Sequence, residues 1–371
     1  MSIYATLGVR RVINADARLT RLGGSLMAPA VREAMDKAAR SYVDMFELQA
    51  AISRRLAELT RNEAAHICTG AAAGLFLATL ACMVGADPAL IAQLPEQNGG
   101  RDEVIIHTAQ RIPYDLAVRQ AGARLVTIGT LLQTLPAELE AAIGPRTAAV
   151  LYIAGAHLER GALPLAEVVA IAHARGVPVI VDAAAQLPPP ENLWRFTSEL
   201  GADLAIFSGG KDLAGPQASG LIVGRAGLVA ACAAHSSPNQ RLGRPMKVGK
   251  EELVGLLAAV EHYLAQDHTT RIARFEQIVA SWVDALDDGD GVRARRVFPN
   301  EAGQPTPRAL VSFDQARCGL SGAEVRRQLW EGDPRVAVAA AGAEAISLTP
   351  DTLEPGEELL VVERIRRILG R

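Results

Sequence analysis

Lys211 follows an apolar run and two glycines, in the order Leu-Ala-Ile-Phe-Ser-Gly-Gly-Lys over residues 204–211. A strand that ends near Ser208 would place Lys211 just beyond its C-terminal end. In a desolvated pocket the amine has a lowered pKa and can form a Schiff base, and the Ser208 hydroxyl could hold a phosphate oxygen. The segment is not a nucleotide P-loop, because Ala205 and Asp212 stand where that motif needs Gly and Ser or Thr. The alternative is an ordinary surface lysine.

An acidic residue ends another apolar run earlier in the chain. Asp182 follows Val179–Val181 and precedes the small residues Ala183-Ala184-Ala185, then Gln186. A buried carboxylate is costly unless it has a partner. A protonated pyridine nitrogen is one suitable partner, and the pairing makes the ring a better electron sink. Ala184 is small enough to lie flat against such a ring. The alternative is an aspartate that caps the next helix.

Small residues open a helix much earlier, at Thr69-Gly70-Ala71-Ala72-Ala73-Gly74. Small side chains let backbone N–H groups approach a phosphate, and the N-terminus of a helix favours an anion. Thr69 adds a hydroxyl donor. A tightly packed helix start without any ligand would have a similar sequence, so this motif is weak when taken alone.

The order of these three segments is more informative than any one of them. A phosphate-binding turn comes first, then an acid after a strand, then a lysine after the following strand. Asp182 and Lys211 are one strand–helix–strand unit apart, which places both at the edge of a sheet where open α/β sheets bind ligands. The residues therefore predict a site for pyridoxal 5'-phosphate (PLP), attached to Lys211.

The elements that must position these residues are short β-branched runs that alternate with Ala/Leu-rich segments. This alternation predicts an α/β fold with a mostly parallel sheet. The expected strands are Glu103–His107, Arg124–Ile128, Ala148–Ile153, Pro178–Val181, Leu204–Phe207 and Gly220–Val223. The expected helices are Ala71–Val84, Ile112–Ala121 and Pro164–Ala174.

The pattern changes after about residue 245, where a second domain is expected. Two long amphipathic helices come first, then strand-like pieces and two further helices. We expect an N-terminal segment and large PLP-binding domain over residues 1–248, and a smaller α+β domain over residues 249–371. The expected elements of this smaller domain are the helices Glu251–Gln266, Thr269–Leu286, Gly322–Trp330 and Glu357–Leu369, with strands at Ala309–Phe313 and Val336–Val338.

These segments together resemble fold-type I PLP enzymes. The closer resemblance is to the selenocysteine-synthase-like branch, which includes D-glucosaminate-6-phosphate ammonia lyase. The resemblance spans nearly the whole chain and is most specific around Asp182 and Lys211. The segments that carry it are Val12–Ala15, Leu22–Ser25, Thr69–Leu75, Asp182–Pro189, Phe207–Lys211, Gly215–Gly220 and Gly243–Glu251.

The resemblance implies a covalent link to the cofactor at Lys211, a pyridinium partner at Asp182 and phosphate contacts from Ser208 and the turn at Thr69–Ala72. It also implies an active site at the interface of a homodimer or of a higher dimer-based assembly, to which the segment Arg244–Glu251 could contribute. The candidate cofactor-binding residues are Thr69, Gly70, Ala71, Ala72, Gln110, Asp182, Ala184, Gln186, Ser208 and Lys211.

The chain departs from the family pattern in two places. Asp16-Ala17-Arg18 stand where the family has a small Ser-Gly pair, so two charged groups are expected near the substrate. Gln110 stands where the family favours a His that stacks on the ring; His107 is nearby, but a structural role is expected for it. Candidate arginines for substrate anions, each with an ordinary surface role as its alternative, are Arg18, Arg111, Arg244 and Arg308.

Composition excludes several other classes of protein. The 371 residues carry a formal net charge of −3. The chain therefore lacks the excess of positive charge that binds nucleic acid or an anionic membrane, which argues against a tRNA substrate. Four scattered cysteines and seven histidines show no spacing of a metal site. The sequence has no apparent signal peptide and no apolar stretch long enough to span a bilayer, so a cytoplasmic enzyme is expected.

The leading hypothesis is elimination of a β-substituent and ammonia from a small amino acid, sugar-derived or phosphorylated, to give a 2-oxo acid. Lys211 would then be the general base that removes the α-proton. One alternative is other PLP chemistry on an amino acid: an aminotransferase, racemase, aldolase or selenium- or sulfur-type transferase. A second is a PLP-binding homologue that has lost catalysis, which would fit the presence of Gln110 where the family favours a His. A third, weaker one is that no cofactor binds.

Overall fold

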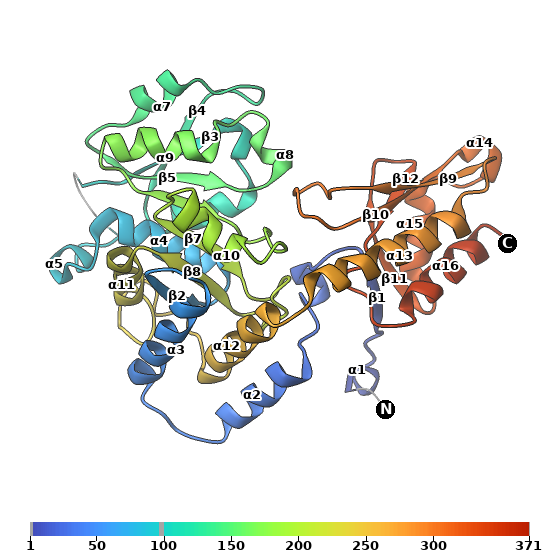
Figure 1. Cartoon of the computed structure of the whole chain (residues 1–371), viewed down its shortest axis with the longest axis horizontal. Helices are drawn as coiled ribbons and strands as arrows, with labels where there is room; N and C mark the ends of the chain where they lie inside the picture. The colour runs from blue at the N-terminus through green and yellow to red at the C-terminus, as the bar shows by residue number, and fades with distance from the viewer. Residues whose placement is uncertain (1–2, 96–99, 371) are drawn as a thin grey trace. The chain divides into compact units, whose positions relative to one another are not determined.

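The computed structural model describes residues 3–95 and 100–370 of the chain. It divides into two compact units, which are described separately (Figure 1). The large unit comprises residues 25–266 together with 301–303. The small unit comprises the chain up to Gly24, residues 267–300 and the chain from Gln304 onward.

The large unit is built on a seven-stranded sheet. Its strands are β2 (Ala64–Cys68), β3 (Glu103–His107), β4 (Arg124–Ile128), β5 (Thr147–Ile153), β6 (Val179–Asp182), β7 (Leu204–Ser208) and β8 (Gly220–Gly224). They lie in the order β2-β8-β7-β6-β5-β3-β4. Strand β8 runs in the opposite direction to the other six strands of this sheet. Every residue of β5 is buried, as expected for a strand covered on both faces. The mostly parallel α/β sheet predicted from the sequence is confirmed.

Helices cover both faces of this sheet and enclose two apolar cores. One face is covered by α4 (Ala71–Val84), α6 (Leu116–Gln120) and α11 (Ala226–His235). The other is covered by α2 (Pro29–Ala39), α3 (Met45–Leu59), α7 (Pro136–Ala142), α9 (Leu165–Ala174) and α12 (Lys250–Leu264). Short elements of this unit are α5 (Pro88–Ile91), α8 (Ala156–Glu159), α10 (Asn192–Trp194), η2 (Thr108–Gln110), η3 (Pro113–Asp115) and η4 (Arg195–Glu199).

The small unit is built on a five-stranded sheet. Its strands are β1 (Val12–Ala15), β9 (Val292–Val297), β10 (Arg308–Phe313), β11 (Arg335–Ala340) and β12 (Ala345–Leu348), in the order β1-β11-β12-β10-β9. Only β1 and β11 pair in parallel. Three helices pack on it around the fully buried Trp282: α13 (His268–Leu286), α15 (Gly322–Glu331) and α16 (Glu357–Ile368). Short elements are α1 (Ile3–Thr6), η1 (Thr20–Leu22) and α14 (Gln315–Cys318).

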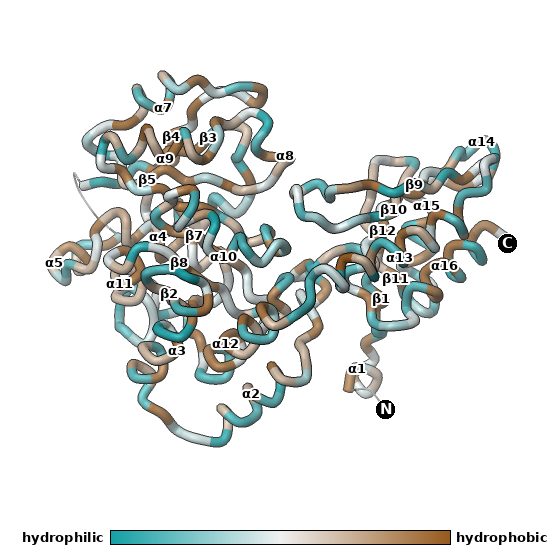
Figure 2. The backbone as a smooth tube through the Cα atoms, viewed as in Figure 1, coloured by the Kyte–Doolittle hydropathy of each residue, from teal (hydrophilic) through white to brown (hydrophobic). Residues whose placement is uncertain are grey.

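The compact units divide the chain elsewhere than the expected boundary at residue 248. The N-terminal segment belongs to the small unit because β1 pairs with β11, with Val12 opposite Arg335. Helix α12 belongs to the large unit because its apolar side packs on α2 and α3. Figure 2 shows the alternation of polar and apolar residues along α13 and α16 that is typical of helices lying on a sheet. Among the described helices, none combines the length and apolarity that crossing a bilayer requires.

Buried His66 on β2 makes the stability of the large unit depend on pH. Its side chain is 2% exposed, its Nε2 lies 2.9 Å from the Ser236 hydroxyl, and burial lowers its pKa to about 4. The unfolded chain therefore binds more protons between pH 6.5 and 4, so stability is full above this window and falls as the pH falls through it. We expect His66 to account for a loss of about 3 kcal/mol across the window.

Urea unfolding of the apoenzyme at pH 7 and pH 5 measures this dependence. The variant His66→Gln is expected to lose less stability on acidification than the wild type. Exposed His262 provides the matched control, and His262→Gln should keep the full pH dependence. An equal loss in the wild type and in His66→Gln would contradict the assignment.

Candidate active site

The strands that precede the candidate residues end in register at one edge of the large sheet. Ser208 of β7 lies opposite Gly220 of β8, and Gly220 lies opposite Cys68 of β2. Asp182 at the end of β6 lies opposite Ile206 of β7. The turns that follow β2, β6 and β7 therefore emerge at the same edge, the one where α/β sheets bind ligands.

The turn that carries Lys211 is fixed by backbone hydrogen bonds. The N–H of Gly215 donates to the Gly209 carbonyl at 2.8 Å, and the N–H of Ala214 donates to the Lys211 carbonyl at 2.9 Å. The same Lys211 carbonyl accepts the hydroxyl of Ser25 at 2.5 Å. The side chain of Lys211 is half-buried. Burial lowers the pKa of its amine, and the charge of Asp182 partly opposes this. The amine is thus more readily neutral and nucleophilic than that of a surface lysine.

Asp182 is a buried carboxylate, 6% exposed. Within the described part of the chain, one of its two oxygens is hydrogen-bonded. Its Oδ1 accepts the N–H of Ala184 at 3.0 Å. Its Oδ2 accepts no hydrogen bond from any residue that the structure describes. Burial raises the pKa of Asp182, while the Ala184 N–H and the Lys211 amine oppose the rise. A cationic ring N–H at Oδ2 would favour the charged carboxylate, as nearby cations do.

The turn between β2 and α4 has the geometry of an anion cradle. Gly70 has φ 87° and ψ 160°, in the left-handed half of backbone space that glycine adopts without strain. The first hydrogen bond of the helix runs from the Gly74 N–H to the Gly70 carbonyl at 3.1 Å. The N–H groups of residues 71–73 therefore have no acceptor within the helix and can receive a phosphate. The Thr69 hydroxyl donates to the Ala218 carbonyl at 3.4 Å.

Gly220 is required for this cradle, because β8 passes directly beside it. A Cβ at Gly220 would lie 2.6 Å from the carbonyl carbon of Gly70 and 2.9 Å from the nitrogen of Ala71. Gly220→Ala should therefore displace the turn, with a loss of about 1–3 kcal/mol in stability and weaker binding of PLP. The measurements are thermal unfolding of the apoenzyme and titration of the apoenzyme with PLP.

Gly227 in α11 gives the matched control for that substitution. No atom lies within 4 Å of a Cβ built there, so Gly227→Ala should leave PLP affinity unchanged and stability the same or slightly higher. Equal PLP affinity in Gly220→Ala and Gly227→Ala would show that the close approach of β8 to the turn at Gly70 does not affect PLP binding.

The two candidate glutamines hold backbone groups near the same edge. Gln110 is fully buried. Its Oε1 accepts the Ile153 N–H at 3.1 Å. Its Nε2 has no hydrogen-bond partner in the part of the chain that the structure describes. Gln186 Nε2 donates to the Ala154 carbonyl at 3.0 Å, and the small Ala184 beside it is half-buried. Both glutamines therefore brace the end of β5 or the residue after it. A direct contact of either with the cofactor stays a prediction.

The candidate arginines fall into both units. In the large unit, Arg111 donates from Nε to Asp115 at 2.5 Å. Arg244 is half-buried, and its guanidinium has no partner among the described residues, so it is open to an anion. In the small unit, Arg18 forms an ion pair with Asp351, and Arg308 begins β10.

Taken together, the residues of the large unit fit PLP. The cradle has unused N–H groups and is free of side-chain bulk at Gly220. Asp182 offers a free oxygen to a ring nitrogen, and the Lys211 amine makes no hydrogen bond with a described residue. The sequence did not point to the hydroxyl of Ser25, which is 186 positions away from the Lys211 carbonyl it binds; its position at the end of the segment Leu22–Ser25 was the available signal.

Comparison with protein families matches residues 12–287 to the family described as "SelA: L-seryl-tRNA selenium transferase". The chain belongs to the SelA family. The match includes both Asp182 and Lys211, and the resemblance predicted from the sequence is confirmed. This SelA-family protein is a fold-type I enzyme with PLP as its cofactor.

Two curated relatives match this SelA-family chain over almost its whole length. A 5'-C-glycyluridine monooxygenase-decarboxylase from Streptomyces sp is 37% identical over 99% of this chain and 92% of the relative. A D-glucosaminate-6-phosphate ammonia lyase from Salmonella typhimurium is 35% identical over 99% of this chain and 98% of the relative. A solved structure of D-glucosaminate-6-phosphate ammonia-lyase is similar with a TM-score of 0.87 and 33% identity, covering 100% of this chain and 98% of that one.

Proposed function

We propose that the protein is a PLP-dependent ammonia lyase that removes a β-substituent and ammonia from a small amino acid and yields a 2-oxo acid. The observation that carries the proposal is the agreement with the ammonia lyase over 99% of the chain in sequence and in fold. The substrate class is a sugar-derived or phosphorylated amino acid. The Lys211–Asp182 arrangement supplies the groups that such a reaction needs.

Each group of the site has a defined task in this reaction. PLP supplies, when bound, an electron sink for negative charge that develops at the substrate α-carbon. The Lys211 amine, made less basic by burial, takes the α-proton at Nζ. Asp182 would stabilise a proton on the ring nitrogen. The N–H groups of residues 71–73 and the Ser208 hydroxyl would hold the phosphate and so orient the ring.

Arginines would hold the anionic groups of the substrate. Arg244 supports this assignment best, because its guanidinium has no partner among the described residues. Arg111 would contribute after exchanging its contact with Asp115. Arg18 and Arg308 of the small unit are proposed as further contacts.

We also propose that the protein acts as a cytoplasmic homodimer, or as a higher assembly of dimers, with its active site at the subunit interface. Large apolar side chains of the large unit are exposed in one stretch of sequence: Leu26 is 69% exposed, Tyr42 is 105% exposed and Phe46 is 57% exposed. We expect these side chains to contribute to the subunit interface, because apolar side chains that form a contiguous exposed patch mark interaction surfaces. A second copy of the chain is the partner that closed symmetry favours.

Incubation of the holoenzyme with a panel of β-hydroxy amino acids, including phosphorylated amino-sugar acids, tests the proposed activity. The expected result is release of 2-oxo acid and ammonia in equal amounts without any amino acceptor. Turnover that depends on an acceptor would indicate transamination and contradict the proposal. A coloured holoenzyme without turnover on the whole panel would also contradict it and would indicate a PLP-binding protein that has lost catalysis.

A second candidate function rests on the relative that is 37% identical, whose name describes a monooxygenase-decarboxylase. In that case the holoenzyme would consume dioxygen and release carbon dioxide from an amino-acid substrate. An oxygen electrode and trapping of carbon dioxide, applied to the same panel, separate this outcome from ammonia release.

A further inference from the structure

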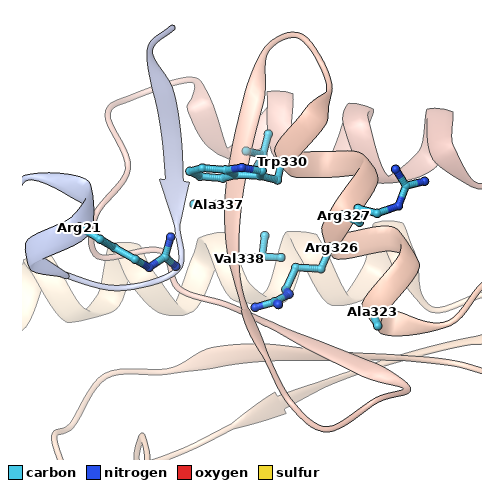
Figure 3. Close-up of a pocket in the computed structure, with 8 residues that line it drawn as sticks. Arg21, Ala323, Arg326, Arg327, Trp330, Ala337 and Val338 are labelled. Carbon is cyan, nitrogen blue, oxygen red and sulfur yellow. The ribbon is translucent and has the colours of Figure 1, made fainter. Parts of the chain in front are cut away.

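A cavity of about 430 Å³ lies in the small unit, lined entirely by its residues. Its volume falls within the range of about 300–1,000 Å³ that is usual for small-molecule sites. One wall comes from α15, whose residues Ala323, Arg326, Arg327 and Trp330 line the cavity. Ala323, Arg326 and Trp330 are spaced three and four residues apart and form a stripe along one side of the helix. Figure 3 shows this stripe facing Arg21 across the cavity. The remaining lining comes from buried residues 336–338 of β11.

Two guanidinium groups extend toward each other across the cavity. Figure 3 shows Arg21, from η1, and Arg326, from α15, pointing inward below the indole of Trp330, while Arg327 points away. Arg327 is held by ion pairs with Glu324 and Glu331. Arg326 forms no ion pair or hydrogen bond with its side chain among the described residues. The cavity therefore contains a cation without a counter-charge.

Arg21 is already held in place but retains unused donors. One of its terminal nitrogens donates to the buried carboxylate of Asp16. A guanidinium has five N–H donors, so Arg21 can bind a second anion while it keeps Asp16. This contact fixes the position of Arg21 before any ligand arrives, which lowers the entropy cost of binding.

The indole of Trp330 gives the cavity a flat apolar wall beside the two cations. The guanidinium of Arg335 lies 4.4 Å from the centre of this ring, and that of Arg21 lies 5.9 Å from it. Arg335 also donates to the Trp330 carbonyl at 2.9 Å, which anchors that residue. A bare oxyanion would occupy only part of the space, so the cavity has room for a larger body against the indole.

We propose that this cavity is a binding site for a small metabolite with a phosphate or carboxylate group. The oxyanion lies between Arg21 and Arg326, where guanidinium forks provide charge-assisted hydrogen bonds. A sugar or planar body lies against Trp330 and the β11 side chains. The residues that line the cavity all belong to the small unit, and its occupancy does not require the proposed lyase activity.

Isothermal titration of the PLP-loaded holoenzyme with glucose 6-phosphate, gluconate and uncharged glucose tests the proposal. The loaded enzyme is used so that the phosphate cradle at Gly70 is already occupied. Saturable binding of either anionic probe is expected, with a dissociation constant of about 1 mM or lower, and no binding of glucose. The probe that binds more tightly identifies the preferred oxyanion.

Arg326→Gln is the decisive variant, because the Arg326 guanidinium forms no ion pair or hydrogen bond with a described residue. It should weaken binding of the anionic probe by about tenfold or more without changing the melting temperature. Arg327→Gln, the neighbouring arginine that points away, is the matched control and should keep the affinity within about twofold. Trp330→Leu should also weaken binding.

Two results would overturn the proposal. One is the absence of saturable binding of both anionic probes to the wild-type holoenzyme. The other is equal affinity in the wild type and in Arg326→Gln, which would place the bound anion elsewhere. Retention of binding in the Lys211→Ala protein loaded with PLP would be consistent with a site distinct from the catalytic one, whereas its loss would overturn the proposal.

Discussion

Replacement of Lys211 by alanine should abolish covalent retention of PLP and lower turnover by about 10³-fold or more, since it removes both the amine that attaches the cofactor and the proposed base. The half-buried amine has a lowered pKa and lies near Asp182, so no other described lysine has the same setting at this edge of the sheet. Borohydride reduction followed by mass spectrometry of the tryptic peptides measures attachment. Product release measures turnover.

Lys37 on α2 gives a control of the same residue type. It is exposed, and Lys37→Ala should keep both the visible absorption of the holoenzyme and its turnover. A colourless wild type, or covalent trapping of PLP by Lys211→Ala, would refute the assignment of Lys211.

Asp182→Asn should lower turnover by about 10²–10³-fold, because it removes the charge that stabilises a proton on the ring nitrogen. The amide oxygen of asparagine can still accept the Ala184 N–H that Asp182 now accepts at 3.0 Å. The fold of the turn should therefore survive, and the loss should come from the charge alone. Steady-state kinetics and thermal unfolding of the variant provide the two measurements.

Asp182→Glu serves as the conservative comparison for this prediction. It keeps the charge but moves the carboxylate, so its turnover should lie between those of the wild type and Asp182→Asn. Turnover of Asp182→Asn close to that of the wild type would exclude the proposed pairing with the ring nitrogen.

The central elements of the large unit were predictable because their apolar runs are long and have clear ends. Helix α4 begins after Gly70 and ends before Gly85, and the predicted bounds match those observed. Strands β3 and β4 also match their predicted bounds. The common edge for Asp182 and Lys211 followed from the same reasoning, because parallel strands joined by helices end on the same side.

Strands with weak intrinsic preference were not predicted. Strand β2 reads Ala-Ala-His-Ile-Cys and has one β-branched residue; it is a strand because it pairs with β8 along its full length. Strand β9 does alternate, as Val-Arg-Ala-Arg, and a search for a period of two would have found it. The short β1 and β12 depend on pairing partners distant in sequence.

The location of α12 shows a different limit of sequence patterns. Its helical bounds were predicted closely, but an apolar face does not say which core it joins. Leu253 and Leu256 pack into the core of the large sheet, so the helix extends the large unit to residue 266. The burial of Gln110 is a similar case, because its contact with Ile153 spans 43 positions.

The position of β8 has a consequence for how the cofactor site forms during synthesis. All of the candidate PLP-binding residues lie at or before Lys211, yet β2 pairs only with β8 within the large sheet. A nascent chain that has passed Lys211 but has not reached Gly224 thus contains every candidate PLP-binding residue without the complete strand β8, which pairs with both β2 and β7. Such long-range pairing is slow to form. Capture of PLP is then a late event, and added cofactor should not rescue folding of a chain truncated before β8.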